Sequence, residues 1–137
     1  IDILRQRSRP YLFSNTLAPA IAAASLKVFD IISTSNKLIT KLNDNKSFFR
    51  TKMSNLGFDL KEGDHPIIPV MLYDAKLAQK MAKKLFEKGV YVVGFFYPVV
   101  PKGQARIRVQ ISAAMSMNDI EKAVNAFEQV GKSLDII

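Results

Sequence analysis

Arg108 lies in a stretch that would let a guanidinium group bind a carboxylate. Residues 105–111 alternate between apolar and polar side chains, which is the pattern of a β-strand with one buried face. The apolar side chains share one face: Ile107, Val109 and Ile111. The polar side chains share the other: Arg106, Arg108 and Gln110. A guanidinium on a rigid strand can bind a carboxylate through two parallel hydrogen bonds. The plainer alternative is a solvated or acid-paired arginine, which is the usual state of such a residue.

Other residues with ligand chemistry are few. His65 is the lone histidine, and without a cysteine or a second histidine it predicts no metal site, only a loop or packing residue. Four lysines spaced four apart form a basic stripe: Lys76, Lys80, Lys84 and Lys88. We favour a solvated helix face for this stripe over an anion-attracting rim, and without interleaved aromatics it gives little support for nucleic-acid binding. Phosphate-loop, zinc-protease and serine-nucleophile motifs are absent from the sequence, so no complete catalytic apparatus is predicted.

The composition is that of a globular domain. Of 137 residues, 48% are hydrophobic and 23% charged, and the net charge of +8 favours anionic partners. The absence of cysteine excludes disulfides, thiolate metal sites and cysteine nucleophiles. The longest apolar run, residues 17–26, is too short to span a bilayer, so no membrane partner is predicted. The chain opens with Ile1 and early charges, so we expect no signal peptide and a piece of a longer protein.

The first third of the chain is predicted to be helical. Residues 18–32 are apolar on nearly all sides, which indicates a helix that packs against something outside this chain. Ser14 and Asn15 offer a hydroxyl and an amide at the expected start of this helix, with Pro19 in its first turn. Pro10 should end any helix among the first residues. A second helix is predicted over residues 36–57.

The rest of the chain reads as β-α-β-β-α. Strands are predicted at residues 66–72, 91–95 and 105–111, and the prolines of the first indicate a strand start or a sheet edge. Asp74 should cap the helix between the first two strands, and a capping box at 116–119 should begin the last helix. Leu77, Ala78, Met81, Leu85 and Phe86 are expected to face inward from the middle helix. The predicted fold class is α+β: a small, largely antiparallel sheet covered by helices on one face and preceded by two long helices.

Three stretches resemble a known family: residues 4–15 (LRQRSRPYLFSN), 65–71 (HPIIPVM) and 94–108 (GFFYPVVPKGQARIR). With them the whole chain resembles the α-oxoamine synthases, which are pyridoxal-phosphate enzymes with the aspartate-aminotransferase fold. The runs SRPYLFSN and YPVVPKG resemble the members that join glycine to acetyl-CoA, rather than those that make 5-aminolevulinate or 8-amino-7-oxononanoate.

The resemblance implies a place for the chain in a larger enzyme. Residues 1–57 would be an interface segment and helices continuing from a large cofactor-binding domain, and residues 58–137 the C-terminal small domain. The parent acyltransferase would condense glycine with acetyl-CoA to 2-amino-3-ketobutyrate, or run the CoA-dependent cleavage in threonine breakdown. It would be a homodimer through its N-terminal segment, with no nucleic-acid or membrane partner, and cytoplasmic in a bacterium or mitochondrial in a eukaryote.

The resemblance also implies roles for three residues. Arg108 would bind the substrate α-carboxylate, and Ser14 and Asn15 would reach the cofactor phosphate of the neighbouring subunit, where helix-terminal N–H groups favour phosphate. The Schiff-base lysine, the aspartate on the pyridine nitrogen and the stacked histidine are expected upstream of Ile1. No catalytic residue is therefore expected in this chain, which alone should be inactive. Met115 stands where the family pattern leads us to expect histidine, and it cannot hydrogen-bond like imidazole.

Two other interpretations stay open. A free-standing α+β module would bind an anion with its basic face and do no chemistry. Another α-oxoamine synthase would use a different acyl-CoA, because the acyl pocket is expected to depend on residues outside this chain.

Overall fold

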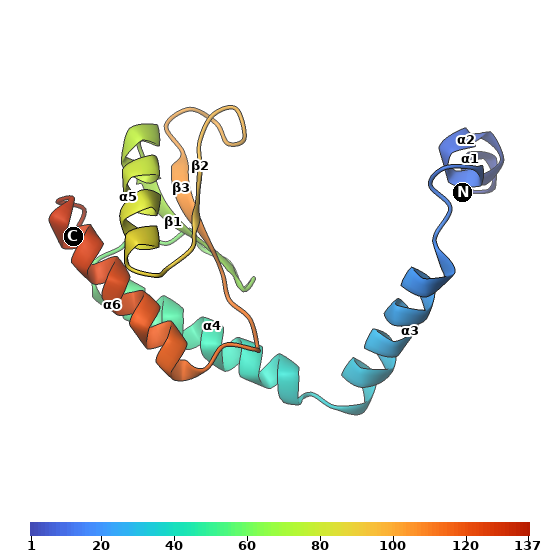
Figure 1. Cartoon of the computed structure of the whole chain (residues 1–137), viewed down its shortest axis with the longest axis horizontal. Coiled ribbons are helices and arrows are strands. Elements are labelled where there is room, and N and C mark those ends of the chain that lie inside the picture. Colours follow the sequence, from blue (N-terminus) through green and yellow to red (C-terminus); the bar gives the residue numbers. More distant parts are fainter. The chain divides into compact units, whose positions relative to one another are not determined.

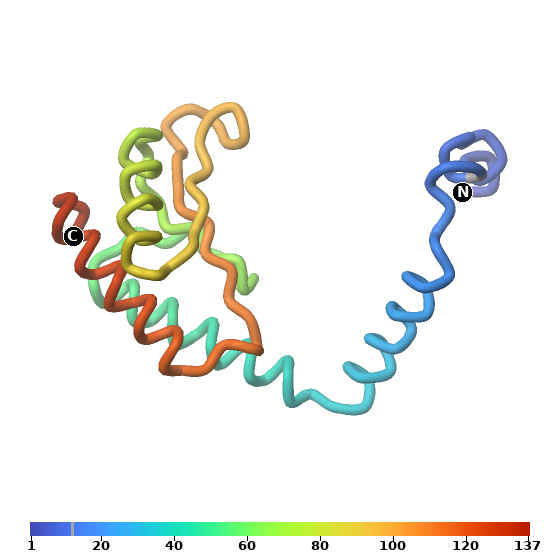
Figure 2. Tube along the Cα trace, viewed as in Figure 1, coloured from blue at the N-terminus to red at the C-terminus, as the bar shows by residue number. Residues whose placement is uncertain are grey.

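A computed structural model, traced along its Cα atoms in Figure 2, describes residues 1–137. The side chain of Leu12 is outside the description. The chain divides into two compact units, Ile1–Leu38 and Ile39–Ile137, and each is described by itself. Every apolar side chain that the structure describes as buried belongs to the second unit. The second unit therefore contains the hydrophobic core and the sheet that carries Arg108.

The first unit is built from helices: α1 (Asp2–Arg7), α2 (Arg9–Leu12) and α3 (Pro19–Thr34). The apolar helix predicted over 18–32 is α3, and Pro19 occupies its first turn as expected. No described side chain of α3 is buried, and Leu26 and Phe29 are 67% and 62% exposed. An apolar helix left so exposed agrees with the prediction that it packs against something outside the chain, which stays a prediction.

One local prediction for this unit was wrong and another held only in part. Helix α1 ends at Arg7, before Pro10, but Pro10 itself lies in the first turn of α2, where the N–H groups have no intrahelical partner and proline loses nothing. Ser14 and Asn15 do not start α3, whose N-cap is Ala18 without a side-chain hydrogen bond. Instead they lie in the bend that follows α2, while Thr16 Oγ1 donates back to the Tyr11 carbonyl at 2.9 Å.

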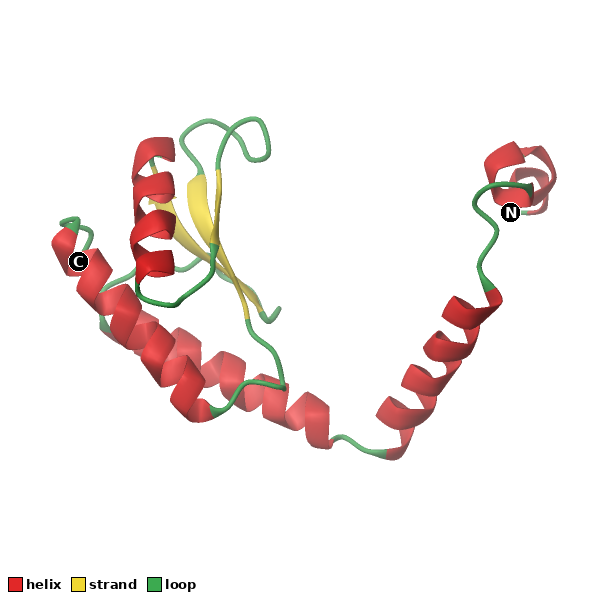
Figure 3. Ribbon diagram, in the orientation of Figure 1, coloured by secondary structure: helices red, strands yellow, loops and turns green.

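The second unit holds a three-stranded antiparallel sheet in the order β1-β3-β2, drawn as yellow arrows in Figure 3. Its strands are β1 (Ile67–Tyr73), β2 (Val93–Phe95) and β3 (Ala105–Gln110). The proline-containing strand β1 is an edge strand of this sheet, as predicted, with a single bridge from Leu60 to Val70 on its other side. The α+β class is confirmed.

Three helices belong wholly or mainly to this unit: α4 (Lys37–Asn55), α5 (Ala75–Glu87) and α6 (Met117–Ser133). Helix α5 lies against the sheet, as Figures 1 and 3 show. It begins where the sequence predicted, because the Asp74 carboxylate accepts the Leu77 N–H at 2.7 Å. The predicted capping box also forms at the start of α6 between Ser116 and Asp119.

The core lies between one face of the sheet and these helices. Its centre is the Phe127 ring of α6, which packs edge-to-face with Phe49 of α4 and with Phe58, both at 6.0 Å between ring centroids. The strands and α5 supply the surrounding buried side chains: Ile68, Val70, Leu72, Ala78, Met81, Leu85, Ile107 and Val109. The domain boundary expected at residue 57 concerns the complete protein and stays a prediction.

One predicted core residue was wrong. Phe86 is 66% exposed on α5 and packs edge-on against the exposed ring of Tyr91. Its neighbour Leu85 takes the buried position, and one residue further along a helix turns the side chain by about 100° away from the core.

Candidate functional site

A tight turn sets the start of the strand that carries Arg108. The Gln104 N–H donates to the Pro101 carbonyl at 3.1 Å, which closes a turn over residues 101–104. Gly103 has φ +73° at the third position of this turn, a conformation that a side chain would oppose. The chain then enters β3 at Ala105, so that the turn fixes which residues of β3 face the core.

The predicted alternation of β3 is confirmed. Ile107, Val109 and Ile111 are buried, whereas Arg108 and Gln110 are exposed on the opposite face. Because the buried side chains flank Arg108 on both sides in sequence, the core holds the backbone from which this arginine projects.

Arg108 lies between two strands. Its register partners are Pro69 on β1 and Val93 on β2. The Pro69 carbonyl accepts the Lys61 N–H at 3.1 Å, so the backbone of Pro69 faces away from β3. Because proline has no N–H, its presence at this position removes no hydrogen bond between β1 and β3. The Pro69–Arg108 pair is therefore of the non-hydrogen-bonded kind, in which opposite side chains lie closest together.

The Arg108 guanidinium stacks over the ring of Phe95, with its central carbon 4.4 Å from the ring centroid. Within the residues that the structure describes, no carboxylate lies within ion-pair distance of it. Arg106, on the same face, donates from Nε to the Gln104 carbonyl at 3.1 Å and from Nη2 to Gln104 Oε1 at 3.4 Å. Of the two arginines on this face, Arg106 thus has Nε and Nη2 engaged with Gln104, whereas Arg108 makes no hydrogen bond to the residues that the structure describes.

A shallow cavity of about 300 Å³ lies on this outer face of the sheet. Its lining comes from β1, β2, β3 and the loop before β3: Ile67, Pro69, Phe95, Val99, Val100, Arg106 and Arg108. Apolar walls with the guanidinium groups of Arg106 and Arg108 suit a small molecule that has a carboxylate and little other polar surface.

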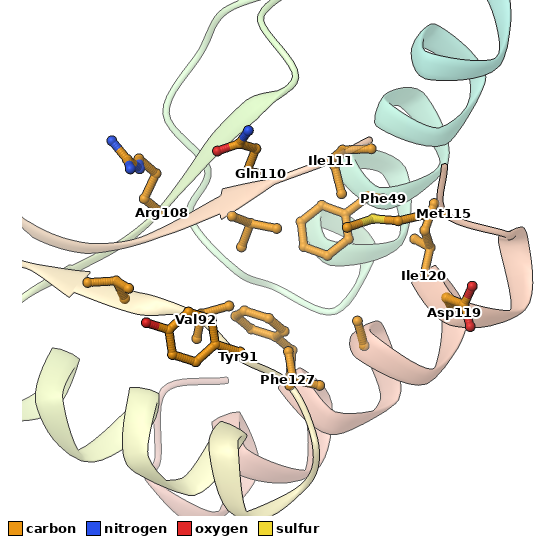
Figure 4. A pocket seen from close by; sticks show the side chains of 14 residues that line it. Phe49, Tyr91, Val92, Arg108, Gln110, Ile111, Met115, Asp119, Ile120 and Phe127 are labelled. Carbon is orange, nitrogen blue, oxygen red and sulfur yellow. The ribbon is translucent and has the colours of Figure 1, made fainter. Parts of the chain in front are cut away.

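A second cavity, of about 330 Å³, lies on the core side between the ends of β2 and β3 and helix α6 (Figure 4). The rings of Phe49 and Phe127 point toward it, while the side chains of Arg108 and Gln110 point away. The Asp119 carboxylate at its border is engaged in the capping box of α6. This cavity is therefore mainly apolar, and the exposed Tyr91 also lines it.

Met115, where the family pattern led us to expect histidine, lines the apolar cavity and packs on the core (Figure 4). Its carbonyl and that of Ser112 accept hydrogen bonds from Asn45 Nδ2 at 3.1 and 3.0 Å. Asn45 is 1% exposed and ties α4 to the segment that follows β3. Sequence reasoning missed Asn45, although its spacing of four from Phe49 places it on the buried stripe of α4.

Ser14 and Asn15 belong to the first unit, where both are exposed. The Asn15 N–H donates to the Pro10 carbonyl at 2.6 Å, and the structure gives neither side chain a hydrogen bond within the residues it describes. A hydroxyl and an amide in this state can donate to phosphate oxygens. Their role toward a cofactor stays a prediction.

His65 and two lysines of the basic stripe have structural roles, while Lys76 and Lys80 are exposed on α5. His65 Nδ1 accepts the Ile67 N–H at 3.1 Å in the loop before β1, and no metal-binding cluster occurs among the described residues. Lys84 and Lys88 donate from α5 to Ser133 and Gln129 of α6, at 2.9 and 2.7 Å.

None of the described helices is long and apolar enough to cross a membrane.

Comparison with known proteins agrees with the resemblance seen in the sequence. The chain is 57% identical over 137 residues to 2-amino-3-ketobutyrate coenzyme A ligase of Escherichia coli (strain K12), covering all of this chain and 34% of that protein. It is 48% identical over 137 residues to 8-amino-7-oxononanoate synthase of Thermosipho melanesiensis, covering 35% of it. A solved serine palmitoyltransferase from S. paucimobilis with a bound PLP-myriocin aldimine superposes with a TM-score of 0.89 at 26% identity, over 99% of this chain and 35% of that one.

The chain spans about a third of the length of the curated relatives it matches. These relatives confirm the resemblance to α-oxoamine synthases, and the structural match confirms the fold of pyridoxal-phosphate enzymes. The model of aminotransferase class I and II matches residues 1–127, and the chain belongs to that family.

Proposed function

We propose that this chain is the C-terminal part of a pyridoxal-phosphate-dependent acyltransferase that joins glycine to acetyl-CoA to give 2-amino-3-ketobutyrate. The reverse reaction is the CoA-dependent cleavage of that product in threonine breakdown. The observation that carries the proposal is the 57% identity, over the whole chain, to a relative named for this product. The exposed Arg108 beside a small apolar-walled cavity supports it.

Arg108 is proposed to bind the α-carboxylate of glycine. The edge of its guanidinium can donate two parallel hydrogen bonds, which fix both the position and the direction of the carboxylate. Fixing the carboxylate restricts rotation of the rest of the small substrate and so orients its Cα bonds for reaction. Pyridoxal phosphate, when bound, supplies the electron sink for the carbanion chemistry.

Ser14 and Asn15 are proposed to hold the cofactor phosphate of the neighbouring subunit in a homodimer. The support is the exposure of a hydroxyl and an amide without other hydrogen bonds among the described residues. The N-terminal N–H groups of α3 lie beyond this pair in the sequence, because α3 begins only at Pro19. Ser14→Ala in the complete protein should weaken cofactor retention during dialysis, and unchanged retention would remove Ser14 from the site.

The test of Arg108 uses the complete protein that contains this chain, loaded with cofactor. Arg108→Ala should raise the KM for glycine on the order of 100-fold, because a bound carboxylate loses a two-point charged partner. Arg108→Lys should also be poor, since an ammonium lacks the planar fork. Cofactor absorbance should stay that of the unsubstituted enzyme in both variants.

Arg106→Lys is the matched comparison, because Arg106 lies on the same face but is already bonded to Gln104. We expect it to change the glycine KM far less than Arg108→Lys does. Unchanged glycine kinetics in Arg108→Ala would refute the assignment.

A second candidate is an α-oxoamine synthase with a longer acyl donor. The 48% identity to an 8-amino-7-oxononanoate synthase supports it. Initial rates of the complete protein with a panel of acyl-CoAs, from acetyl to long-chain, discriminate between the two. A preference for acetyl-CoA agrees with the first candidate. For either candidate enzyme, the family predicts a location in the cytoplasm of a bacterium or the mitochondrion of a eukaryote.

A further inference from the structure

We propose that Phe95 is a positioning residue for Arg108, and that its ring holds the guanidinium in the orientation that binds a carboxylate. This inference rests on the proposed role of Arg108 in substrate binding. Its basis is the stacking contact between the two side chains, 4.4 Å from the guanidinium carbon to the ring centroid.

The register of the sheet builds this contact. Phe95 on β2 pairs with Arg106, and Val93 pairs with Arg108, so the four side chains share the outer face of the sheet. Phe95 and Arg108 are therefore diagonal neighbours across two antiparallel strands, a separation that an aromatic ring and a long side chain can bridge. Phe95 is itself half-buried, which limits its own motion.

The geometry lets Arg108 make two interactions at once. A ring contacts the flat face of a guanidinium, while the N–H groups that bind a carboxylate lie along its edge. Stacking thus leaves the ligand-binding donors available. No carboxylate of the described chain competes for them, since none lies within ion-pair distance of Arg108.

The expected benefit is pre-organisation. An exposed arginine has many rotamers, and ordering it on binding a ligand costs conformational entropy. A ring that already selects the rotamer lowers that cost and so tightens binding through the guanidinium. Loss of the ring should therefore raise the KM for glycine and leave kcat nearly unchanged.

The experiment uses the complete cofactor-loaded protein and measures glycine KM and kcat. Phe95→Leu removes the ring and keeps an apolar side chain, and we expect KM to rise about 2- to 5-fold, the range of an exposed cation–π contact. Phe95→Tyr keeps the ring and should restore the KM of the unsubstituted enzyme. Phe95→Met is a second ring-free variant if the leucine variant yields little folded protein. Phe86→Leu, an exposed ring on α5 in contact with Tyr91, is the control and should change neither constant.

A double substitution separates positioning from a merely structural role. If the ring acts through the guanidinium, Phe95→Leu should have no further effect on glycine KM in an Arg108→Ala background. An equal effect in both backgrounds, or a Phe95→Tyr variant as impaired as Phe95→Leu, would overturn the inference about Phe95 alone. An Arg108→Ala variant with unchanged glycine KM would overturn the proposed role of Arg108 and this inference with it.

Discussion

Gly131 is a buried residue of α6 where a single methyl group should destabilise the fold. A Cβ at this position would lie 2.6 Å from Cζ of Phe58, and 3.0 and 3.2 Å from the Cγ1 and Cδ1 atoms of Ile137. Phe58 is 4% exposed and its ring packs edge-on against Phe127, so it has little room to move aside. Gly131→Ala therefore forces an overlap with the rigid centre of the core.

Two opposing effects set how much Gly131→Ala changes the free energy of unfolding. Alanine in a helix interior is about 1 kcal/mol more favourable than glycine, so sequence alone suggests that Gly131→Ala stabilises. Overpacking a well-packed core costs about 1–3 kcal/mol. A contact as short as 2.6 Å with a fixed ring belongs in the upper part of that range. We expect a net loss of about 1–2 kcal/mol in the free energy of unfolding.

The assay is urea unfolding of residues 39–137, the unit that contains all buried apolar residues described, followed by circular dichroism. Gly131→Ala should lower the midpoint without changing the slope. Phe58→Leu supplies the control background, because leucine lacks the Cζ atom that the new methyl would meet. There Gly131→Ala should be neutral or stabilising. A higher midpoint for Gly131→Ala alone, or an equal loss in both backgrounds, would refute the reasoning.

Two further predictions concern the segment between β3 and α6. Asn45→Leu should lower the free energy of unfolding by about 2–3 kcal/mol in the same urea assay, because it removes two hydrogen bonds to the Ser112 and Met115 carbonyls inside the protein. A loss below about 0.5 kcal/mol would contradict this expectation. Hydrogen bonds from Ser116 lower the pKa of Asp119, so this carboxylate contributes stability above its unfolded pKa that is lost as pH falls through its folded pKa. Ser116→Ala should move the pKa of Asp119 back toward its ordinary value in an NMR titration, and an unchanged pKa would contradict that cause.

The outer face of β3 could be predicted because its signal is local. A period of two over residues 105–111 assigns each side chain to a face, and a shift of one residue would bury Arg108 instead of Ile107. The contact with Phe95 could not be predicted in the same way. It depends on the register between β2 and β3, and β2 has only three residues, too few for an alternation to show.

The wrong predictions arose where a local sequence pattern is compatible with two different structures. Pro10 is compatible with the end of one helix and with the first turn of the next, and both occur here, since α1 ends at Arg7 and α2 begins at Arg9. Ser14 and Asn15 are typical cap residues, yet Pro19 fixes the helix start four residues beyond the pair. Phe86 satisfies the apolar pattern of α5 but lies beyond the edge of its buried stripe.

The position of Arg108 follows from the different roles of the two faces of β3, one of which packs in the core while the other is exposed. Its neighbours Ile107 and Val109 are 0% and 8% exposed, so moving the backbone at Arg108 would require moving the core. A guanidinium on such a strand is positioned more precisely than one on a loop. Recognition of a small carboxylate requires this precision. Arg106 shares this support, but its Nε and Nη2 atoms donate to Gln104. Core packing therefore sets where the Arg108 guanidinium lies, and the hydrogen bonds on the outer face leave Arg108 the less engaged of the two arginines.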